Sequence, residues 1–239
     1  MKSPAASFDE IRAVATSLPA SGFVWPSSFG HPRIVLFAAT HGIAAGLPGG
    51  SSQDMTELVE EVVAGRAPLH ALVAQADADL RLYDLALDRP TRDSRAAPAM
   101  DEVEVCRAAA YGMMAVEPGV DIFVAAALGP GAELAGAALA ESLVEGGDPL
   151  ERLAAKGGLD IAAILGVILA SRLAGIPLIL DGVAARAAAS VAVRLSADAL
   201  VHCRTATADP MANPLGIVPI LPGSADSPLS GVRALMAGF

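Results

Sequence analysis

Aromatic side chains are scarce in this sequence: only 4% of its 239 residues are aromatic, although 54% are hydrophobic. The core must therefore be built mainly from Ala, Leu and Val. Such a core favours helices that pack closely on a sheet, and it argues against a module that binds its ligands through many exposed aromatic rings. The length suffices for one domain with a full core, so we assign residues 1–239 to a single domain.

Positive charge and cysteine are also in short supply. The 16 Lys and Arg residues are outnumbered by 26 Asp and Glu residues, and the formal net charge is −10. A surface with this balance argues against nucleic acid as a partner. The only cysteines, Cys106 and Cys203, are too few for a disulfide framework or a metal cluster. We expect two buried thiols, no metal site and a cytoplasmic protein.

Signals for export or membrane insertion are missing as well. The first 20 residues lack the long apolar centre of a secretion signal. The apolar run 161–171 falls well short of the ~20 residues that a membrane-spanning helix needs. We therefore expect no membrane partner.

Strand-like and helix-like segments alternate along almost the whole chain. This alternation predicts an α/β fold: a three-layer, doubly wound, mostly parallel sheet with helices on both faces. The expected strands are 33–39, 79–84, 120–127, 177–180, 199–203 and 217–221. The expected helices are 7–18, 53–64, 68–76, 99–116, 132–144, 161–173, 183–195 and 229–236, with residues 146–149 as a linker. Ser7 is the expected cap of the first helix, with Glu10 as its capping-box partner. The first and last helices are candidates for a small subdomain.

The chain is organised around the stretch 157–203. Gly157-Gly158-Leu159-Asp160 leads into a helix that is apolar on most sides, and Gly175-Ile176-Pro177 ends that helix. The following strand, Leu178-Ile179-Leu180, ends in Asp181-Gly182. Ligands of open α/β sheets bind at the carboxyl ends of the strands, so Asp181 is a candidate binding residue.

These two motifs, together with His41-Gly42, resemble those of the nicotinate-nucleotide:dimethylbenzimidazole phosphoribosyltransferases, over roughly half of the chain. The resemblance implies a doubly wound α/β sheet and a homodimer, and we expect Ala-rich helices in its interface. The family moves a ribose phosphate from nicotinate mononucleotide onto the nitrogen base that becomes the lower ligand of cobalamin. We expect no cofactor, and the implied partners are nicotinate mononucleotide and a benzimidazole-type base.

The first candidate site follows the strand 33–39. The family ends this strand in Asp-His-Gly, whereas this chain has Thr40-His41-Gly42, so a hydroxyl without charge replaces the carboxylate of the base pocket. The alternative interpretation is that His41 is a structural residue that packs beneath the loop.

The second candidate is the glycine turn Gly129-Pro130-Gly131 at the start of a helix. Such a turn can direct backbone N–H groups at an anion, although Pro130 removes one of them. Of the family's motif, Gly-Glu-Met-Gly-Ile-Gly-Asn-Thr-Thr, only Gly129 is kept with certainty. The family's Glu falls on Ala127, and its Thr pair on Glu133-Leu134, where the carboxylate of Glu133 would repel a phosphate. A helix that is capped by its own carboxylate is the alternative interpretation.

The third candidate concerns the catalytic base. The family uses the Glu of a Gly-Glu-Gly segment, but no Glu follows Glu151 in this chain. Asp226 is the only carboxylate near the corresponding segment, and it is therefore the candidate catalytic residue. The candidate substrate-binding residues are Thr40, His41, Gly42, Gly129, Gly131, Lys156, Gly157, Gly158 and Asp181.

Three functional hypotheses follow. The preferred one is a divergent, catalytically impaired homologue of the family, linked to synthesis of the cobalamin lower ligand. The alternative is an active phosphoribosyltransferase. A third hypothesis, a nucleotide-binding oxidoreductase, rests on the Gly129-x-Gly131 spacing alone and has little support.

Overall fold

The computed structural model describes residues 7–20, 22–207, 219–221 and 230–237. Its centre is a six-stranded sheet in the order β2-β1-β3-β4-β5-β6, in which every neighbouring pair is parallel. The strands are β1 Pro32–Ala38, β2 Asp79–Asp84, β3 Ile122–Leu128, β4 Leu178–Asp181, β5 Cys203–Thr207 and β6 Pro219–Leu221. The predicted α/β fold is thereby confirmed.

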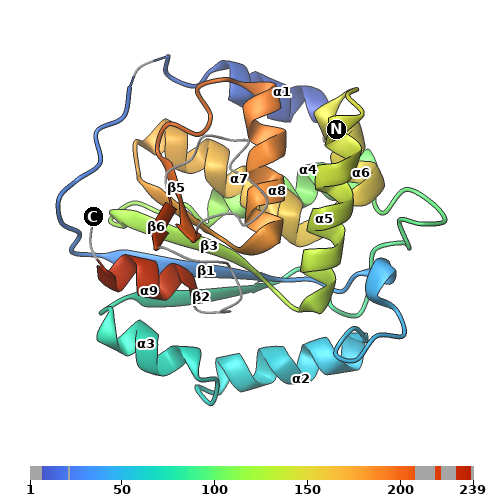
Figure 1. The fold of residues 1–239 in the computed structure, drawn as a ribbon, viewed down its shortest axis with the longest axis horizontal. Helices are drawn as coiled ribbons and strands as arrows, with labels where there is room; N and C mark the ends of the chain where they lie inside the picture. Colours follow the sequence, from blue (N-terminus) through green and yellow to red (C-terminus); the bar gives the residue numbers. More distant parts are fainter. Residues whose placement is uncertain (1–6, 21, 208–218, 222–229, 238–239) are drawn as a thin grey trace, which may run out of the picture.

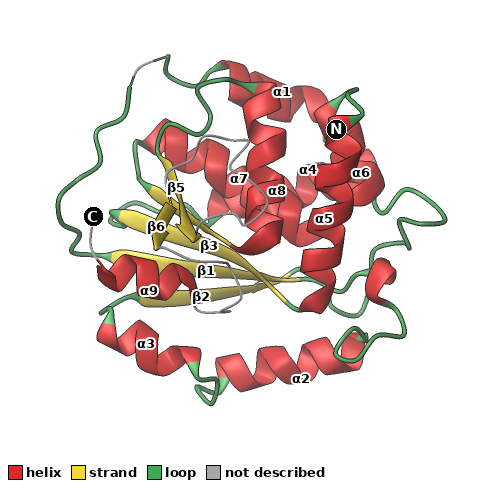
Figure 2. Cartoon of the chain, in the orientation of Figure 1, coloured by secondary structure: helices red, strands yellow, loops and turns green. Residues whose placement is uncertain are grey.

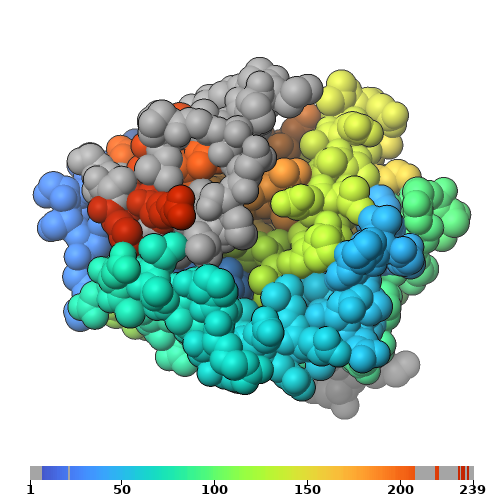
Figure 3. Space-filling model, turned by 60° about the horizontal axis from the view of Figure 1, so that its bottom comes forward, coloured from blue at the N-terminus to red at the C-terminus, as the bar shows by residue number. Residues whose placement is uncertain are grey.

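Helices cover both faces of the sheet (Figure 1 and Figure 2). One face carries α1 Phe8–Thr16, α4 Glu102–Met114, α5 Pro130–Val144, α6 Pro149–Lys156, α7 Leu159–Ala174 and α8 Gly182–Leu195. The other face carries α2 Ser52–Val63, α3 Leu69–Gln75 and α9 Ser230–Ala237, and Figure 3 views the molecule from this side. A short 3-10 helix, Gly42–Ala44, follows β1. Helices α1 and α9 lie on opposite faces of the sheet. The small subdomain expected from the first and last helices remains a prediction.

Side chains of the central strands alternate between two hydrophobic clusters. In β1, Val35 and Phe37 join the cluster beneath α4, α7 and α8, whereas Ile34 and Leu36 join the one beneath α3 and α9. All seven residues of β1 are buried. This continuous burial is what a central strand of a parallel sheet requires, because helices cover both of its faces.

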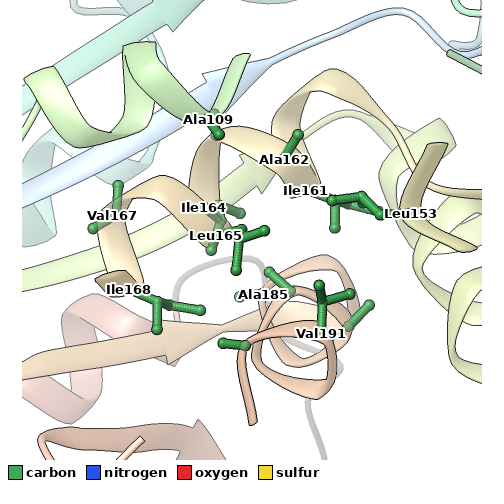
Figure 4. Packing of buried hydrophobic residues seen from close by; sticks show 14 of the residues in the cluster. Ala109, Leu153, Ile161, Ala162, Ile164, Leu165, Val167, Ile168, Ala185 and Val191 are labelled. Carbon is green, nitrogen blue, oxygen red and sulfur yellow. The ribbon is translucent and has the colours of Figure 1, made fainter. Parts of the chain in front are cut away.

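The largest cluster surrounds α7 (Figure 4). Ile161, Ile164, Leu165 and Ile168 are fully buried there, against side chains of α4 and α8. The backbones of α4 and α7 touch: a Cβ atom placed on Gly112 or Gly166 would collide with a carbonyl of the other helix. Small residues at the crossing permit this approach, which explains how a core with so few aromatic rings reaches close packing.

Two predicted segments are wrong. The predicted strand 199–203 is misplaced: residues 199–202 form turns that bury Ala199 and Leu200, and β5 begins only at Cys203. The predicted linker 146–149 ends in a helix, because Asp148 accepts hydrogen bonds from the backbone N–H groups of Leu150 and Glu151 and so caps α6.

The expected capping box at Ser7 is also absent. The Ser7 side chain makes no cap hydrogen bond to α1. The backbone N–H of Phe8 instead donates to the carboxylate of Glu102, at a distance of 2.6 Å. A carboxylate from α4 thus accepts a backbone N–H at the start of α1, and this hydrogen bond joins the first helix to the face that it covers.

Both cysteines, Cys106 and Cys203, are buried and free, as expected. Within the described part of the chain, no helix is long and apolar enough to cross a membrane.

Candidate functional site

The strand order reverses between β1 and β3, so a crevice is expected where the carboxyl ends of these two strands diverge. His41 follows β1, and Gly131 lies in the first turn of α5, which follows β3. The two residues are in contact: a Cβ atom on Gly131 would lie 2.7 Å from the Cβ atom of His41. The first two candidate segments are therefore neighbours at the topological switch point.

His41 is held by a carboxylate from a third element. Its Nε2 lies 3.0 Å from Oδ2 of Asp160, in the first turn of α7, and both side chains are buried. Gly158 lies against the other edge of the ring, where an added Cβ would be 2.7 Å from Nδ1 of His41. Burial lowers the pKa of His41, but the charge and hydrogen bond of Asp160 outweigh it, so this pKa is raised above its usual value. Nδ1 has no partner among the described residues.

The neighbours of His41 connect β1 to the segment after β2. The hydroxyl of Thr40 donates to the carbonyl of Leu87 at 2.9 Å, and the carbonyl of Thr40 accepts from the N–H of Thr91 at 3.0 Å. Gly42 packs against the backbone of residues 91–93, and a Cβ atom there would collide with it. The hydroxyl that replaces the family's carboxylate is thus buried in a structural hydrogen bond.

The start of α5 has the geometry of a glycine turn. Gly129 has φ 111° and ψ 153°, a conformation that favours glycine, and it is the N-cap residue of a helix with Pro130 at its first position. The sulfur of Met55, from α2, lies directly against Gly129. Glu133 is in the first turn of α5 and is exposed. Its negative charge suits the helix dipole and would repel an anion that approached this end of the helix.

Lys156 and Gly157 belong to the end of α6. The Lys156 ammonium group donates to the carbonyl of Ser94 at 2.6 Å, which holds the loop after β2 against α6. Gly157 is in contact with Leu153, one turn earlier. The position of Lys156 is therefore fixed by the protein's own backbone.

Asp181 lies at the carboxyl end of β4, as predicted. Its Oδ2 accepts a hydrogen bond of 2.8 Å from the N–H of Gly231, in the first turn of α9. A Cβ atom on Gly231 would lie 2.5 Å from a methyl carbon of Val124. Asp226, the candidate catalytic residue, lies outside the described residues.

The geometry brings together His41, Gly131, Gly158 and Asp160. Sequence reasoning placed Asp160 only within a motif and missed its pairing with His41. Two signals could have indicated it: a carboxylate in the first turn of an apolar helix, and a histidine at the end of an apolar strand. In a parallel sheet, the strands end and the helices leading to the next strands begin at the same edge. The histidine and the carboxylate were therefore candidates for an ion pair.

A second buried histidine, His202, makes no such site. Its Nε2 lies 2.9 Å from the hydroxyl of Ser171, and its pKa is lowered to about 3, mainly by burial. Burial raises the pKa of the adjacent Cys203 thiol, which disfavours the reactive thiolate form. In the described residues, no three Asp, Glu, His or Cys side chains are grouped so that they could hold a metal ion.

A family model described as "Phosphoribosyltransferase" matches residues 1–147 and 142–211. The nicotinate-nucleotide–dimethylbenzimidazole phosphoribosyltransferase of Brucella anthropi is 32% identical over 208 residues, which cover 72% of this chain and 61% of that protein. The protein of the same name from Roseobacter denitrificans is 34% identical over 207 residues, with the same coverage of 72% and 61%. The chain thus spans 61% of the length of these relatives.

Two solved structures have the same fold. The crystal structure of CobT from Thermus thermophilus matches with a TM-score of 0.78 and 23% identity, over 99% of this chain and 90% of that one. A structure of the nicotinate-nucleotide–dimethylbenzimidazole phosphoribosyltransferase of the same organism gives a TM-score of 0.75 at 21% identity, over 98% and 88%.

Proposed function

Because the chain belongs to the nicotinate-nucleotide:dimethylbenzimidazole phosphoribosyltransferase family, we propose that it binds nicotinate mononucleotide or a benzimidazole-type base but transfers ribose phosphate poorly or not at all. The ligand lies over the carboxyl ends of β1 and β3, beside His41 and Gly131. The protein is then linked to synthesis of the cobalamin lower ligand as a binding protein or a weak enzyme.

The start of α5 is the observation that carries this proposal. Where the family's motif has an acid, this chain has Ala127, and where it has hydroxyl groups, the chain has the exposed carboxylate of Glu133. A carboxylate in the first turn of a helix competes with a phosphate for the same N–H groups. The substitutions therefore remove the acid and weaken the binding of the phosphate. Both losses act on the same transition state.

The alternative is an active phosphoribosyltransferase. It is favoured by the buried pair of His41 and Asp160, which fixes the loop after β1 in one position relative to α7. Such rigid positioning is useful to an enzyme, because binding energy is not spent on ordering the loop. In this alternative Asp226 is the general base that takes the proton from the attacking nitrogen.

Titration calorimetry with nicotinate mononucleotide and dimethylbenzimidazole separately tests the binding, and an assay for ribose phosphate transfer tests the chemistry. We expect binding of at least one compound and no transfer above background. A general base typically contributes ~10²–10⁴-fold in rate, so its loss is readily measured. Transfer that disappears in Asp226→Asn would establish the alternative. Absence of binding for both compounds would overturn the proposal.

We also propose that the chain forms a homodimer. The support is the family resemblance together with large apolar side chains that are exposed on the single chain, such as Met114. Covering apolar groups of this kind is one reason for two chains to associate. Light scattering that gave the mass of one chain, 24.0 kDa, at micromolar concentration would contradict the homodimer.

A further inference from the structure

A hollow lies at the carboxyl end of the edge strand β2, beyond β1 from the switch point. Its volume of about 490 Å³ is in the range of sites for small molecules. One wall is a face of α4 on which Arg107, Ala108 and Tyr111 recur at helical spacing. The other wall is the chain from Asp84 to Arg89, and Leu159 at the start of α7 completes the lining. We call this space the β2 hollow.

Two opposite charges at the β2 hollow lack a close partner. Arg107 has no hydrogen bond or ion pair to any part of the chain that the structure describes. The carboxylate of Asp88 is 83% exposed, and its contact with Arg89 is long, at 3.9 Å. Arg107 and Asp88 line the same hollow from different walls and do not pair with each other. A molecule that lay between them would satisfy both charges.

The other acidic groups of the hollow are already engaged within the chain. Asp84 accepts a hydrogen bond of 3.0 Å from the N–H of Leu87. Glu104 accepts one of 3.3 Å from the guanidinium group of Arg92. The charges that remain for a ligand are therefore one cation on α4 and one carboxylate on the facing segment.

The wall that carries Asp88 has a fixed shape. Ala86 has φ 60°, a left-handed conformation that costs free energy in any residue but glycine and persists only where the surrounding structure holds it. The hydroxyl of Thr40 donates to the carbonyl of Leu87 at 2.9 Å and fastens the segment to the end of β1. A ligand would thus meet a preformed wall, and little of its binding energy would be lost in ordering the segment.

The hollow also has apolar surface beside its two charges. Tyr111 is 49% exposed, and Ala108 and Leu159 lie in the same lining. An aromatic ring of this kind stacks favourably with the ring of a ligand. The lining therefore combines a cation, a carboxylate and an apolar surface.

We propose that the β2 hollow binds a free amino acid with an aromatic side chain. Arg107 holds the carboxylate of the ligand, to which a guanidinium group donates two parallel hydrogen bonds. Asp88 accepts hydrogen bonds from the ammonium group, and the side chain packs on Tyr111 and Leu159. A zwitterion suits the hollow because a molecule with a single charge would leave Arg107 or Asp88 without a partner. This inference goes beyond the transferase proposal, whose ligand lies over β1 and β3.

Titration calorimetry of the full chain with three related compounds tests the class of ligand. Phenylalanine carries both charges, 3-phenylpropanoate only the carboxylate, and phenethylamine only the ammonium group. We expect phenylalanine to bind at least about tenfold more tightly than either analogue, because each analogue loses one charge-assisted hydrogen-bonding group. Equal affinities for the three compounds, or no heat of binding at about 10 mM phenylalanine, would overturn the proposal.

Two variants test the place of binding. Arg107→Gln should weaken the binding of phenylalanine at least about tenfold and leave the weaker binding of phenethylamine unchanged. Asp88→Asn should also weaken phenylalanine, but it should leave the binding of 3-phenylpropanoate unchanged. Both side chains are exposed, so both variants should fold, and circular dichroism checks this.

Arg66→Gln is the matched control. It removes an exposed guanidinium group between α2 and α3, on the other face of the sheet, and should leave the affinity for phenylalanine unchanged. An equal loss in Arg66→Gln, or no loss in Arg107→Gln, would overturn the site in the β2 hollow. The transferase proposal is tested separately, because its compounds are nicotinate mononucleotide and dimethylbenzimidazole.

Discussion

The imidazole Nε2 of His41 lies 3.0 Å from the carboxylate Oδ2 of Asp160, and the two side chains are 1% and 0% exposed. The pair connects the end of β1 to the start of α7, and its two members are 119 residues apart in the chain. Glycines on two sides leave room for the ring, since Gly131 and Gly158 both touch it. The pair therefore fixes the relative positions of three elements at the switch point.

The stabilising effect of this pair should depend on pH. The pKa of His41 is raised in the folded chain above the ordinary value of 6.5, so the folded state binds the proton more tightly. Stability from the charged pair is therefore fully present below about pH 6.5 and is lost as the pH rises through the raised pKa. Asp160→Asn should cost about 3–5 kcal/mol at the acidic end, because it leaves a buried charge without its partner.

Urea denaturation of the wild type and Asp160→Asn between about pH 5.5 and about pH 9 checks this expectation. The difference in free energy of unfolding should shrink as the pH rises. Asp88→Asn removes an exposed carboxylate and controls for the change in net charge. A difference that stays constant across the range would contradict a charged His41.

Gly158 should be intolerant of any side chain. Its added Cβ would collide with the His41 ring and lie 2.7 Å from the carboxylate of Asp160, and neither group can move away in a buried site. We expect Gly158→Ala to destabilise the fold by about 1–3 kcal/mol, as overpacking does. Gly22→Ala is the matched control, since nothing lies within 4 Å of that position. Equal denaturation midpoints for the two variants would refute the steric argument.

The sheet could be predicted from the sequence because burial and apolar runs coincide in it. Strand β1 has seven buried residues, and five of them, Ile34 to Ala38, form a continuous apolar run. Strand β5 does not: Thr205 and Thr207 are buried although they are polar, while the apolar run just before them forms turns. Tertiary packing determines which of these two segments forms the strand, and the periodicity of the sequence could not predict it.

The site was less predictable than the fold for a related reason. His41 could be placed at a strand end, but its partner Asp160 lies far away in sequence, and only the crossover geometry joins them. Helix α6 was missed for a different reason, since its signals were local. Asp148 followed by Pro149 is a capping residue before a first-turn proline, and it begins the helix.

Asp181 should matter for the attachment of α9. Its carboxylate accepts the N–H of Gly231 at the start of that helix, so Asp181→Ala removes an acceptor from a helix N-terminus. The loss should be about 0.5–2 kcal/mol. Hydrogen exchange of the α9 amides should quicken more than that of α7. Asp181→Asn keeps an acceptor oxygen and should show a smaller effect; identical exchange in both variants would show that the hydrogen bond is unimportant.

The charge of Glu133 should oppose nucleotide binding at the start of α5. It lies in the first turn of this 15-residue helix, where the helix dipole and the free N–H groups would otherwise attract a phosphate. Removing one charge at such a position is worth about 0.3–1 kcal/mol, so Glu133→Gln should bind nicotinate mononucleotide about two- to fivefold more tightly. Glu141→Gln, on the same helix but beyond its first turns, removes the same charge and should leave the affinity unchanged. Calorimetry at low and high salt shows whether the gain in affinity is electrostatic, because an electrostatic gain must become smaller as the salt concentration rises. An equal gain in both variants would mean that net charge is responsible, and no gain in either would place the phosphate elsewhere.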